Sequence, residues 1–476
     1  MREVECFFGG RPRICGRMPG MPLQADVVIA GAGIAGVSTA YHLSVELGCE
    51  RVILCDPRPP LTLTSDKSTE CYRNWWPGPG NGMVSLMNRS IDLLEEWAEL
   101  SNDAFHLSQR GYLYATADNR HLAKMHEQAR SISALGGGEL RTHRGSVDDP
   151  DYIASGPTGF AGNPTGADLF LDGETLRRHF PYLSPAAVGG LHARRAGWFS
   201  AQQLGTWLLA GAREAGATLV SDKIVEVDLE DGRVAGVRLE SGKSIQAERF
   251  INAAGPFLAE VGAMVGVDLP VFSEVHRKIS IADSRRALPR NAPMLIWDDP
   301  QQLGWSRDEV DLLSSEPDLA FLAGQLGPGA HCRPEGSGDA DTVLGLWEYK
   351  KDVRPPEFPI PPDRFYPEIV MRGLSTMIPA FGAYLERLPD PYIDDGYYTK
   401  TTENRPLIGP VGPAGSYVVG ALSGYGVMAA AAAGELGALQ ALGGELPGYA
   451  SWFAPARYED PNYLALVPEM TESGQI

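Results

Sequence analysis

The stretch ADVVIAGAGIAGVSTAYHLSVELGCERVILCDP, residues 25–57, decides the fold class. An apolar run at 27–30 has strand character, and a G-x-G-x-x-G pattern follows it at once. Residues 37–47 then have the spacing of an amphipathic helix, and a second apolar run ends on Asp56. This glycine pattern binds a dinucleotide when it joins a strand to a helix and a second strand ends on an acid. We therefore predict an α/β fold with a Rossmann-like domain.

Each residue of that pattern has a distinct physical task in a dinucleotide site. Gly31 permits the tight turn, Gly33 allows the backbone to approach a pyrophosphate, and Gly36 lets the helix pack closely on the strand. The N–H groups at the helix start attract phosphate. Asp56 can accept hydrogen bonds from an adenosine ribose, and its charge disfavours NADP. The motif alone leaves FAD and NAD both open.

Composition narrows the class of protein. The chain has 476 residues, of which 43% are hydrophobic, which is enough for about two or three domains with sizeable cores. Its 41 basic and 60 acidic residues give a net charge of −19, which argues against nucleic acid or an anionic membrane as the main partner. The six cysteines form no C-x-x-C pair and no zinc spacing with the nine histidines, so we expect no metal site.

The cysteines, the apolar runs and the first residues of the chain indicate where in the cell the protein is expected. Cysteines without a C-x-x-C pair or a zinc spacing indicate a reduced, cytoplasmic protein, and an organellar matrix stays open as an alternative. The apolar run at 428–442 is too short and too interrupted to span a bilayer, so no membrane span is expected. We expect residues 1–24 to be a flexible tail, although a transit peptide stays open because this segment holds four arginines.

The segment STECYRNWWPGPGNG, residues 68–82, combines a cation with adjacent indole rings. It is too rich in glycine and proline for a helix and too aromatic for an ordinary solvent loop. Two alternatives follow. Trp75 and Trp76 are either part of a core with Arg73 capping a carbonyl group, or all three line a pocket in which a cation and indole rings meet a ligand.

Further along the chain, strands and helices alternate irregularly. Turns at Asp231-Gly232 and Ser241-Gly242 predict two β-hairpins between 224 and 252. Residues 270–362 have many prolines and glycines and several short strands, which predicts a second, mostly antiparallel sheet domain. A helix of small residues begins near Gly426 and offers a second helix N-terminus for a cofactor, or simply tight packing.

Four ordered segments together resemble the FAD-dependent D-amino-acid oxidase superfamily, in the branch that holds sarcosine oxidases, glycine oxidases and dimethylglycine dehydrogenases. They are the first glycine motif, GRVAGVRLESGKSIQAERFINAAGPF at 232–257, HCRPEGSGDADTVLGLWE at 331–348 and ENRPLIGPVGPAGSYVVGALSGYGVMAAAAAGELGA at 403–438. The last segment has Ser-Gly-Tyr-Gly where the family usually has Ser-Gly-His-Gly. The resemblance covers residues 25 to about 443.

The resemblance implies FAD as cofactor and a discontinuous domain organisation. The FAD-binding domain is expected at 25–110, 167–268 and 366–450, the interleaved substrate domain at 111–166 and 269–365, and a tail at 451–476. The residues expected to contact FAD are Gly31, Gly33, Ile34, Ala35, Gly36, Asp56, Pro57, Arg58, Ser68, Thr69, Ile224, Val225, Ala253, Ala254, Gly255, Arg405, Gly424, Tyr425, Gly426, Val427 and Met428.

The resemblance also gives roles to substrate-contacting residues. Arg73 falls where sarcosine oxidases carry an arginine that pairs with the substrate carboxylate, a task suited to the planar guanidinium group. Trp75 and Trp76 are candidate pocket walls, and Tyr398 and Tyr425 are candidate substrate contacts, each with packing as the alternative. Lys278 is expected to reach the flavin ring and assist electron transfer to oxygen, or else to be a solvated lysine.

Three departures from the family pattern point to a substrate other than sarcosine. Glu335, not arginine, follows Pro334, and Met428 stands where monomeric sarcosine oxidases have a carboxylate-binding lysine. The stretch that carries their flavin-linked cysteine has Tyr397 and Tyr398 and no cysteine, so we predict non-covalent FAD.

The expected function is oxidation of the C–N bond of a secondary amine or amino acid, by hydride transfer to flavin N5 and hydrolysis of the imine. Molecular oxygen or an electron carrier then takes the electrons. Oxidation of a 2-hydroxy acid is one alternative, and a non-catalytic FAD-holding factor that binds or assembles partners is another.

Overall fold

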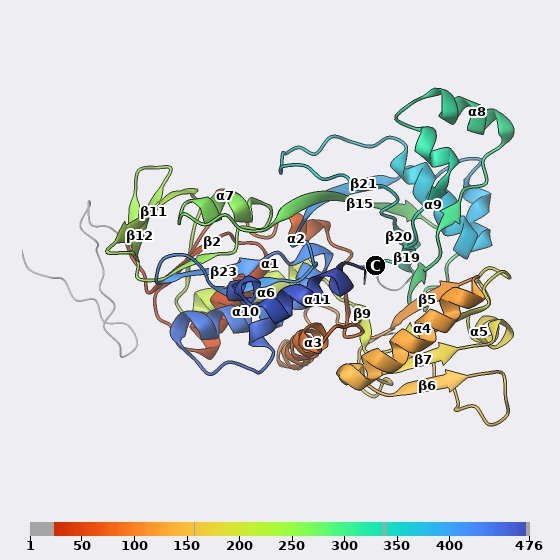
Figure 1. The fold of residues 1–476 in the computed structure, drawn as a ribbon, viewed down its shortest axis with the longest axis horizontal. Coiled ribbons are helices and arrows are strands. Elements are labelled where there is room, and N and C mark those ends of the chain that lie inside the picture. The colour runs from red at the N-terminus through yellow and green to blue at the C-terminus, as the bar shows by residue number, and fades with distance from the viewer. Residues whose placement is uncertain (1–22, 157, 337–338, 473–476) are drawn as a thin grey trace, which may run out of the picture.

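The computed structural model describes residues 23–156, 158–336 and 339–472, and Figure 1 shows how their elements are arranged. A six-stranded sheet with its helices lies in one half of the molecule, and a nine-stranded sheet lies in the other. Strands β15 (Phe272–Ala282) and β21 (Tyr392–Lys400) run from one half towards the other. The predicted tail at 1–24 lies mostly outside the described residues, except that Leu23–Gln24 form strand β1.

The six-stranded sheet confirms the Rossmann-like prediction. Its order is β10-β3-β2-β14-β23-β22, and all neighbours are parallel except β22 and β23. The strands are Thr218–Val220, Val52–Cys55, Val27–Ala30, Phe250–Asn252, Ser416–Gly420 and Leu407–Pro410. Continuous apolar strands suit a sheet that is buried on both faces.

Side chains alternate along β2, so the two faces of the six-stranded sheet pack into two different cores. Val27 and Ile29 point into a core shared with helices, whereas Val28 and Ala30 point into a core shared with a smaller sheet. The helices on the first face are α1 (Ile34–Tyr41), continued by a π-helical turn at His42–Glu46, α3 (Gly82–Leu100), α6 (Ala201–Glu214) and α10 (Gly426–Leu442). Helix α10 packs against both α1 and α3.

The smaller sheet contains the two predicted hairpins. Its order is β1-β13-β12-β11, with β11 at Ile224–Glu230, β12 at Arg233–Leu239 and β13 at Ser244–Gln246. Asp231 and Gly232 join the first pair with φ of 49° and 74°, the left-handed geometry that a tight hairpin turn requires.

The nine-stranded sheet has the order β21-β15-β20-β19-β16-β5-β8-β7-β6. Besides β15 and β21, its strands are Thr342–Leu346, Ala330–Pro334, Met294–Trp297, Tyr112–Thr116, Gly189–Ala193, Ala167–Phe170 and Leu140–His143. Most neighbours are antiparallel, as predicted, and β16–β5 and β6–β7 are parallel.

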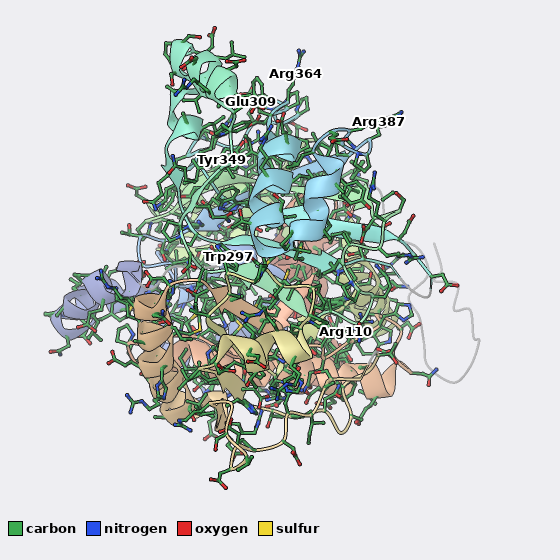
Figure 2. All side chains as sticks on the ribbon, turned by 90° about the vertical axis from the view of Figure 1, so that its right-hand side faces the viewer. Arg110, Trp297, Glu309, Tyr349, Arg364 and Arg387 are labelled. Carbon is green, nitrogen blue, oxygen red and sulfur yellow. The ribbon has the colours of Figure 1, made fainter. Side chains whose placement is uncertain are left out.

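Helices cover this sheet on both faces. They are α4 (Asn119–Ile132), α5 (Gly173–His179) and α9 (Tyr366–Met377), whereas α8 (Arg307–Ser315) projects away from the sheet. Figure 2 shows this half of the molecule from the side, with Glu309 on the projecting helix α8 and with Tyr349 and Trp297 below it. Along β5, Leu113 and Ala115 face the core that contains α9, whereas Tyr112 and Tyr114 face α4.

Strand pairing places some segments outside their predicted domains. Strands β7 and β8, at 167–193, pair with β5 and β6, and β21, at 392–400, pairs with β15, so these segments belong to the nine-stranded sheet. Helix α9 packs on β16, β19 and β20 of that sheet as well. The predicted boundaries are wrong there because periodicity identifies a strand or helix but not the sheet against which it packs.

The predicted C-terminal tail is also folded in its described part. Helix α11 spans Pro461–Glu472, and the preceding turn holds Arg457 in a buried ion pair with Glu403, 2.7 Å long. Shorter elements complete the fold: α2 (Thr64–Lys67), α7 (Leu258–Ala263), the β4–β9 pair (Cys71–Arg73 with Ala196–Trp198) and the β17–β18 pair (Gln301–Gln302 with Gln325–Leu326). No helix in the described ranges is long and apolar enough to cross a bilayer.

Candidate functional site

A first cavity follows the carboxyl ends of the central parallel strands. Its walls include the glycine turn after β2, Asp56 after β3, residues 253–256 after β14 and residues 420–424 after β23. Ligands of open α/β sheets bind at this edge, where helices begin after the strands. The remaining wall comes from Arg58, Pro59, residues 61–65, Ser68, Tyr397, Tyr398, Thr399, Val419, Gly426 and Val427.

The glycine turn has the close contacts that its sequence predicts. Gly31 has a φ of +104°, and a Cβ added there would lie 2.5 Å from the Ala253 carbonyl oxygen. A Cβ on Gly36 would lie 2.1 Å from the Gly31 carbonyl oxygen, so helix α1 can approach the turn only without a side chain. Both positions therefore require glycine.

Side chains fix the backbone on either side of this turn. The Asp56 carboxylate accepts bonds from Ala32 N and Arg58 N, each 2.9 Å long. The Ser65 hydroxyl accepts a 3.0 Å bond from Ile34 N at the start of α1. Ser65 was not predicted, because it lies 31 residues from its partner and outside any motif.

At the far end of the first cavity, the chain turns sharply from β23 into α10. Ala421 and Ser423 have φ of 53° and 50°, and α10 begins at Gly426. The turn brings N–H groups of a helix start to the cavity wall, where they favour negative charge. The start of this helix therefore lies at the cavity wall, and its interior face is tightly packed as well.

The predicted cofactor contacts divide into two groups. Those that line the first cavity are Gly31, Gly33, Ile34, Ala35, Asp56, Arg58, Ser68, Ala253, Ala254, Gly255, Gly424, Gly426 and Val427. Those that do not are Gly36, Pro57, Thr69, Ile224, Val225, Arg405, Tyr425 and Met428. Ile224 is buried in the core under the small sheet and Val225 is 44% exposed, and neither belongs to the wall of the first cavity.

A second, larger cavity of about 660 Å³ lies against the nine-stranded sheet. Arg73, Trp75, Tyr112 and Tyr114 form part of its wall, together with Thr69 and Met428. This volume falls within the range of small-molecule sites. The predicted pocket for Arg73 and Trp75 is therefore present, and the segment 68–82 reaches it along β4.

The two tryptophans have different environments. Trp76 is buried in the core beneath α10 and does not line the second cavity, so packing is the correct alternative for it. Its indole N–H donates to the Arg73 carbonyl oxygen at 3.2 Å, and the Arg73 guanidinium lies 4.4 Å from its ring centre. Trp76 therefore supports Arg73 from behind.

Tyr425 also proves to be a packing residue. It is 1% exposed, its ring meets Trp76 edge-on, and its hydroxyl donates a 2.9 Å bond to the Asn404 carbonyl oxygen. The neighbouring Arg405 guanidinium donates to the carbonyl oxygens of Glu403 and Asn404. These two predicted contacts stabilise the loop that faces α10 instead of lining either cavity.

Tyr398 lines both cavities, as does Gly424. The junction of the two cavities is therefore at these residues. Tyr398 stacks on His276, with ring centroids 3.7 Å apart and planes inclined by 16°. A ligand group that reaches the end of the first cavity would meet the second cavity beside this stacked pair.

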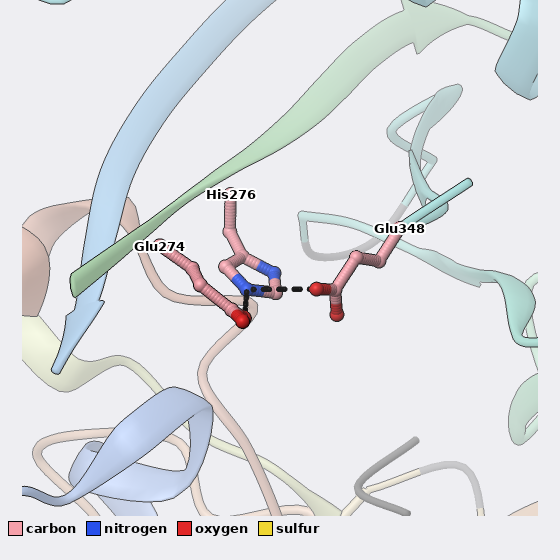
Figure 3. A group of neighbouring side chains, drawn as sticks. All are labelled: Glu274, His276 and Glu348. Atoms are coloured by element: carbon pink, nitrogen blue, oxygen red, sulfur yellow. Dashed lines mark hydrogen bonds and ion pairs between the residues drawn. The ribbon is translucent and has the colours of Figure 1, made fainter. Parts of the chain in front are cut away.

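His276 belongs to a cluster that the sequence did not reveal. Ligand-type atoms of Glu274, His276 and Glu348 lie within 4.8 Å of one another on the wall of the second cavity (Figure 3). His276 Nε2 lies 3.4 Å from a Glu274 oxygen and 3.5 Å from a Glu348 oxygen. Lys400 Nζ contacts the Glu274 carboxylate, so an ammonium group already balances that charge, and we assign no metal to the cluster.

The cluster has strongly shifted pKa values. Burial raises the pKa of Glu348 to about 7, and a hydrogen bond with Glu274 adds to this. Although burial opposes it, bonds from His276 and Lys400 lower the pKa of Glu274 to about 2. Burial lowers the pKa of His276 to about 4, so its imidazole is neutral at pH 7. Such shifts in a cavity are typical of functional sites.

Lys278 lies behind the cavity walls. Its Nζ donates a 2.7 Å bond to the carbonyl oxygen of Ser68, a residue of the first cavity, and lies 3.6 Å from Asp394. Burial lowers the pKa of Lys278. With a side chain 12% exposed, it is not a solvated lysine, and it reaches the first cavity through Ser68.

The first cavity fits an extended dinucleotide. It joins an acid suited to a ribose, a glycine turn with a helix start suited to a pyrophosphate, and a second helix start suited to an electron-accepting ring. No cysteine among the described residues lines this cavity.

Comparison with known proteins gives a consistent result. Residues 26–439 match the family described as FAD dependent oxidoreductase. Human mitochondrial dimethylglycine dehydrogenase is 27% identical over 301 residues, which cover 60% of this chain and 31% of that protein. Sarcosine oxidase subunit beta of Rhizobium meliloti (strain 1021) is 27% identical over 261 residues, covering 54% of this chain and 56% of that protein.

The fold is also shared with solved structures. L-proline dehydrogenase from P. horikoshii superposes with a TM-score of 0.70 at 20% sequence identity, covering 92% of this chain and 99% of that chain. By contrast, this chain spans only about a third of the human relative that it matches.

Proposed function

Because the chain belongs to the FAD dependent oxidoreductase family, we propose that it oxidises the C–N bond of a secondary amine or amino acid. The observation that carries this proposal is the junction at Tyr398 and Gly424, where a dinucleotide cavity meets a second cavity that contains Arg73. The names of its relatives, dimethylglycine dehydrogenase and sarcosine oxidase subunit beta, support an N-methylated amino acid or a similar compound as substrate.

Non-covalently bound FAD supplies the hydride acceptor in this proposal. The protein contributes binding and orientation. Arg73 pairs with the substrate carboxylate, the aromatic wall of Trp75 and Tyr112 excludes water, and the reacting carbon lies near Tyr398. The resulting imine is hydrolysed in solvent, and oxygen or an electron carrier reoxidises the cofactor. Lys278, bonded to Ser68, supplies positive charge near the first cavity for that second step.

His276 supports a second candidate, oxidation of a 2-hydroxy acid. That chemistry requires a group that takes the hydroxyl proton, and a neutral histidine at the cavity junction suits it. The two candidates are tested by adding N-methyl amino acids or 2-hydroxy acids anaerobically to the FAD-loaded protein. Loss of the flavin absorbance band with amines alone supports the first candidate, and loss with hydroxy acids alone supports the second.

A further inference from the structure

The wall of the second cavity has a carboxylate that the proposed function does not yet use. Glu348 follows strand β20 and lines the cavity, and 33% of its side-chain surface is accessible. Glu274 lines the same cavity but is only 3% exposed. Glu348 is therefore the carboxylate of this pair that offers a ligand the larger accessible surface.

The charge of Glu348 is also less balanced by neighbouring groups than that of Glu274. Among the described residues it has an ion-pair contact with His276 and none with a lysine or arginine, whereas Glu274 contacts Lys400. With Glu274 and Lys400 offsetting each other and His276 neutral, ionised Glu348 gives the cluster a net charge of about −1. A single cation bound in the cavity would neutralise the charge of this cluster.

The carboxylate-binding candidate Arg73 belongs to the same cavity. His331 also lines this cavity, and burial together with the positive charge of Arg73 lowers its pKa to about 4. The wall of this cavity thus includes both a guanidinium and a carboxylate, with the Tyr398 junction near the carboxylate. This pattern is complementary to a zwitterion that has both a carboxylate and an ammonium group.

We propose that Glu348 binds the ammonium group of an amino-acid substrate and takes its proton before oxidation. Glu274, paired with Lys400, holds Glu348 in place. This inference rests on the proposed function, because only the free amine has the lone pair that oxidation needs. The substrate N–H bond breaks, an O–H bond forms on Glu348, and the electron pair stays on nitrogen. That pair then supports loss of the hydride from the adjacent carbon to the oxidant, FAD.

The charged and titratable groups around Glu348 come from three segments. They are Glu274 and His276 on β15, Lys400 and Tyr398 on β21, and Lys351 on its own segment. Because the pKa of Glu348 is raised to about 7, the proton-accepting form is lost as the pH falls below 7. Reduction of the cofactor by an amine should therefore slow about tenfold for each pH unit below that value.

Binding of glycine betaine tests the proposal without turnover. Betaine carries a carboxylate and a permanent cation but no nitrogen lone pair. When it binds FAD-loaded protein at pH 6.5, we expect Glu348 to ionise and to release most of a proton, measured by calorimetry in two buffers of different ionisation enthalpy. Glu348→Gln should bind betaine at least about tenfold more weakly and release no proton, whereas Glu348→Asp should still release one.

The matched control is Asp298→Asn. Asp298 is a carboxylate of the same cavity, but its partner is His121, at 3.0 Å. This variant should release the same proton as wild type. Wild-type protein that binds no betaine, or equal proton release in Glu348→Gln and wild type, would overturn the proposal.

Anaerobic reduction by amines separates this inference from the proposed function. If amines reduce the cofactor and Glu348→Gln keeps the wild-type pH profile, Glu348 is not the proton acceptor, although the proposed function holds. If betaine binding depends on Glu348 but no amine reduces the cofactor, the ammonium site is supported and the proposed function is wrong.

Discussion

The ring of Tyr398 stacks on the imidazole of His276 at 3.7 Å, and this contact joins the two cavities of the molecule. Tyr398 lines both cavities, while His276 lines only the second. The pair comes from neighbouring strands, β21 and β15, whose register places Tyr398 opposite Glu274. One cross-strand contact therefore connects the proposed cofactor cavity with the charged cluster.

Replacing Tyr398 tests the importance of this junction. Tyr398→Phe keeps the stacked ring and should bind FAD and substrate nearly as wild type does. Tyr398→Ala removes the ring and should weaken substrate binding by about tenfold, since a stacked pair contributes about 0.5–1.5 kcal/mol beyond the area that it buries. Spectral titration of the flavin with substrate measures both variants. If Tyr398→Phe and Tyr398→Ala weakened substrate binding equally, the hydroxyl group and not the ring would be responsible for the junction's contribution.

The glycine turn gives a prediction about cofactor binding. Gly36→Ala places a Cβ 2.1 Å from the Gly31 carbonyl oxygen, so α1 must move away from the turn. We expect the purified variant to retain little FAD, as measured by the ratio of flavin to protein absorbance. Gly304→Ala is the control, since its added Cβ would meet nothing within 4 Å. Normal FAD content in Gly36→Ala would contradict the assignment of this turn to the cofactor.

Arg73 gives a prediction about substrate charge. Arg73→Lys keeps the positive charge but loses the planar fork, so we expect KM for a carboxylate substrate to rise by at least about tenfold. Arg73→Ala should raise it further. For an amine without a carboxylate, KM should rise much less in both variants than it does for the amino acid. Steady-state kinetics with this pair of substrates measures the difference. Equal losses for both substrates would place Arg73 in a structural role.

The buried pair Glu403–Arg457 gives a prediction about stability. Both side chains are 1% exposed, and the hydroxyls of Tyr458 and Tyr463 also donate to Glu403. Glu403→Gln leaves the guanidinium uncompensated and should lower the free energy of unfolding by about 3–5 kcal/mol, measured by urea denaturation. Glu226→Gln, which breaks an exposed pair with Arg238, should cost less than about 1 kcal/mol.

The pH dependence of this contribution has a definite sign. Although burial opposes it, Arg457 and Tyr458 lower the pKa of Glu403 below its ordinary value of 4.5. The stabilisation is therefore fully present above about pH 4.5 and is lost as the pH falls through the lower, folded-state pKa. The difference between wild type and Glu403→Gln should shrink in that acid range. A difference that stays constant down to pH 2 would contradict the ion-pair account.

The sequence predicted those parts of the site that are local in the chain. The glycine turn, Asp56 and the start of α10 each consist of a few consecutive residues whose chemistry requires a fixed spacing, so a motif identifies them. Arg73 and Trp75 were found by combining an unusual composition with a family resemblance, and the structure places both on the second cavity.

The cluster around His276 could not be found in this way. Glu274 and His276 share one face of β15, but Glu348 and Lys400 come from other segments of the nine-stranded sheet. Only the pairing of β15 with β20 and β21 brings them together. For the same reason the sequence assigned 167–193 to the wrong domain, since strand periodicity does not specify the partner strand.

The proposed function requires that the FAD-loaded protein oxidises an amine in the second cavity. The most direct test is an anaerobic absorbance titration with N-methyl amino acids, D- and L-amino acids and 2-hydroxy acids, after acid precipitation has established whether the flavin is released. We predict released flavin, bleaching of its absorbance band by at least one amine, and loss of that bleaching in Arg73→Ala. A bound flavin that no amine bleaches would contradict the account.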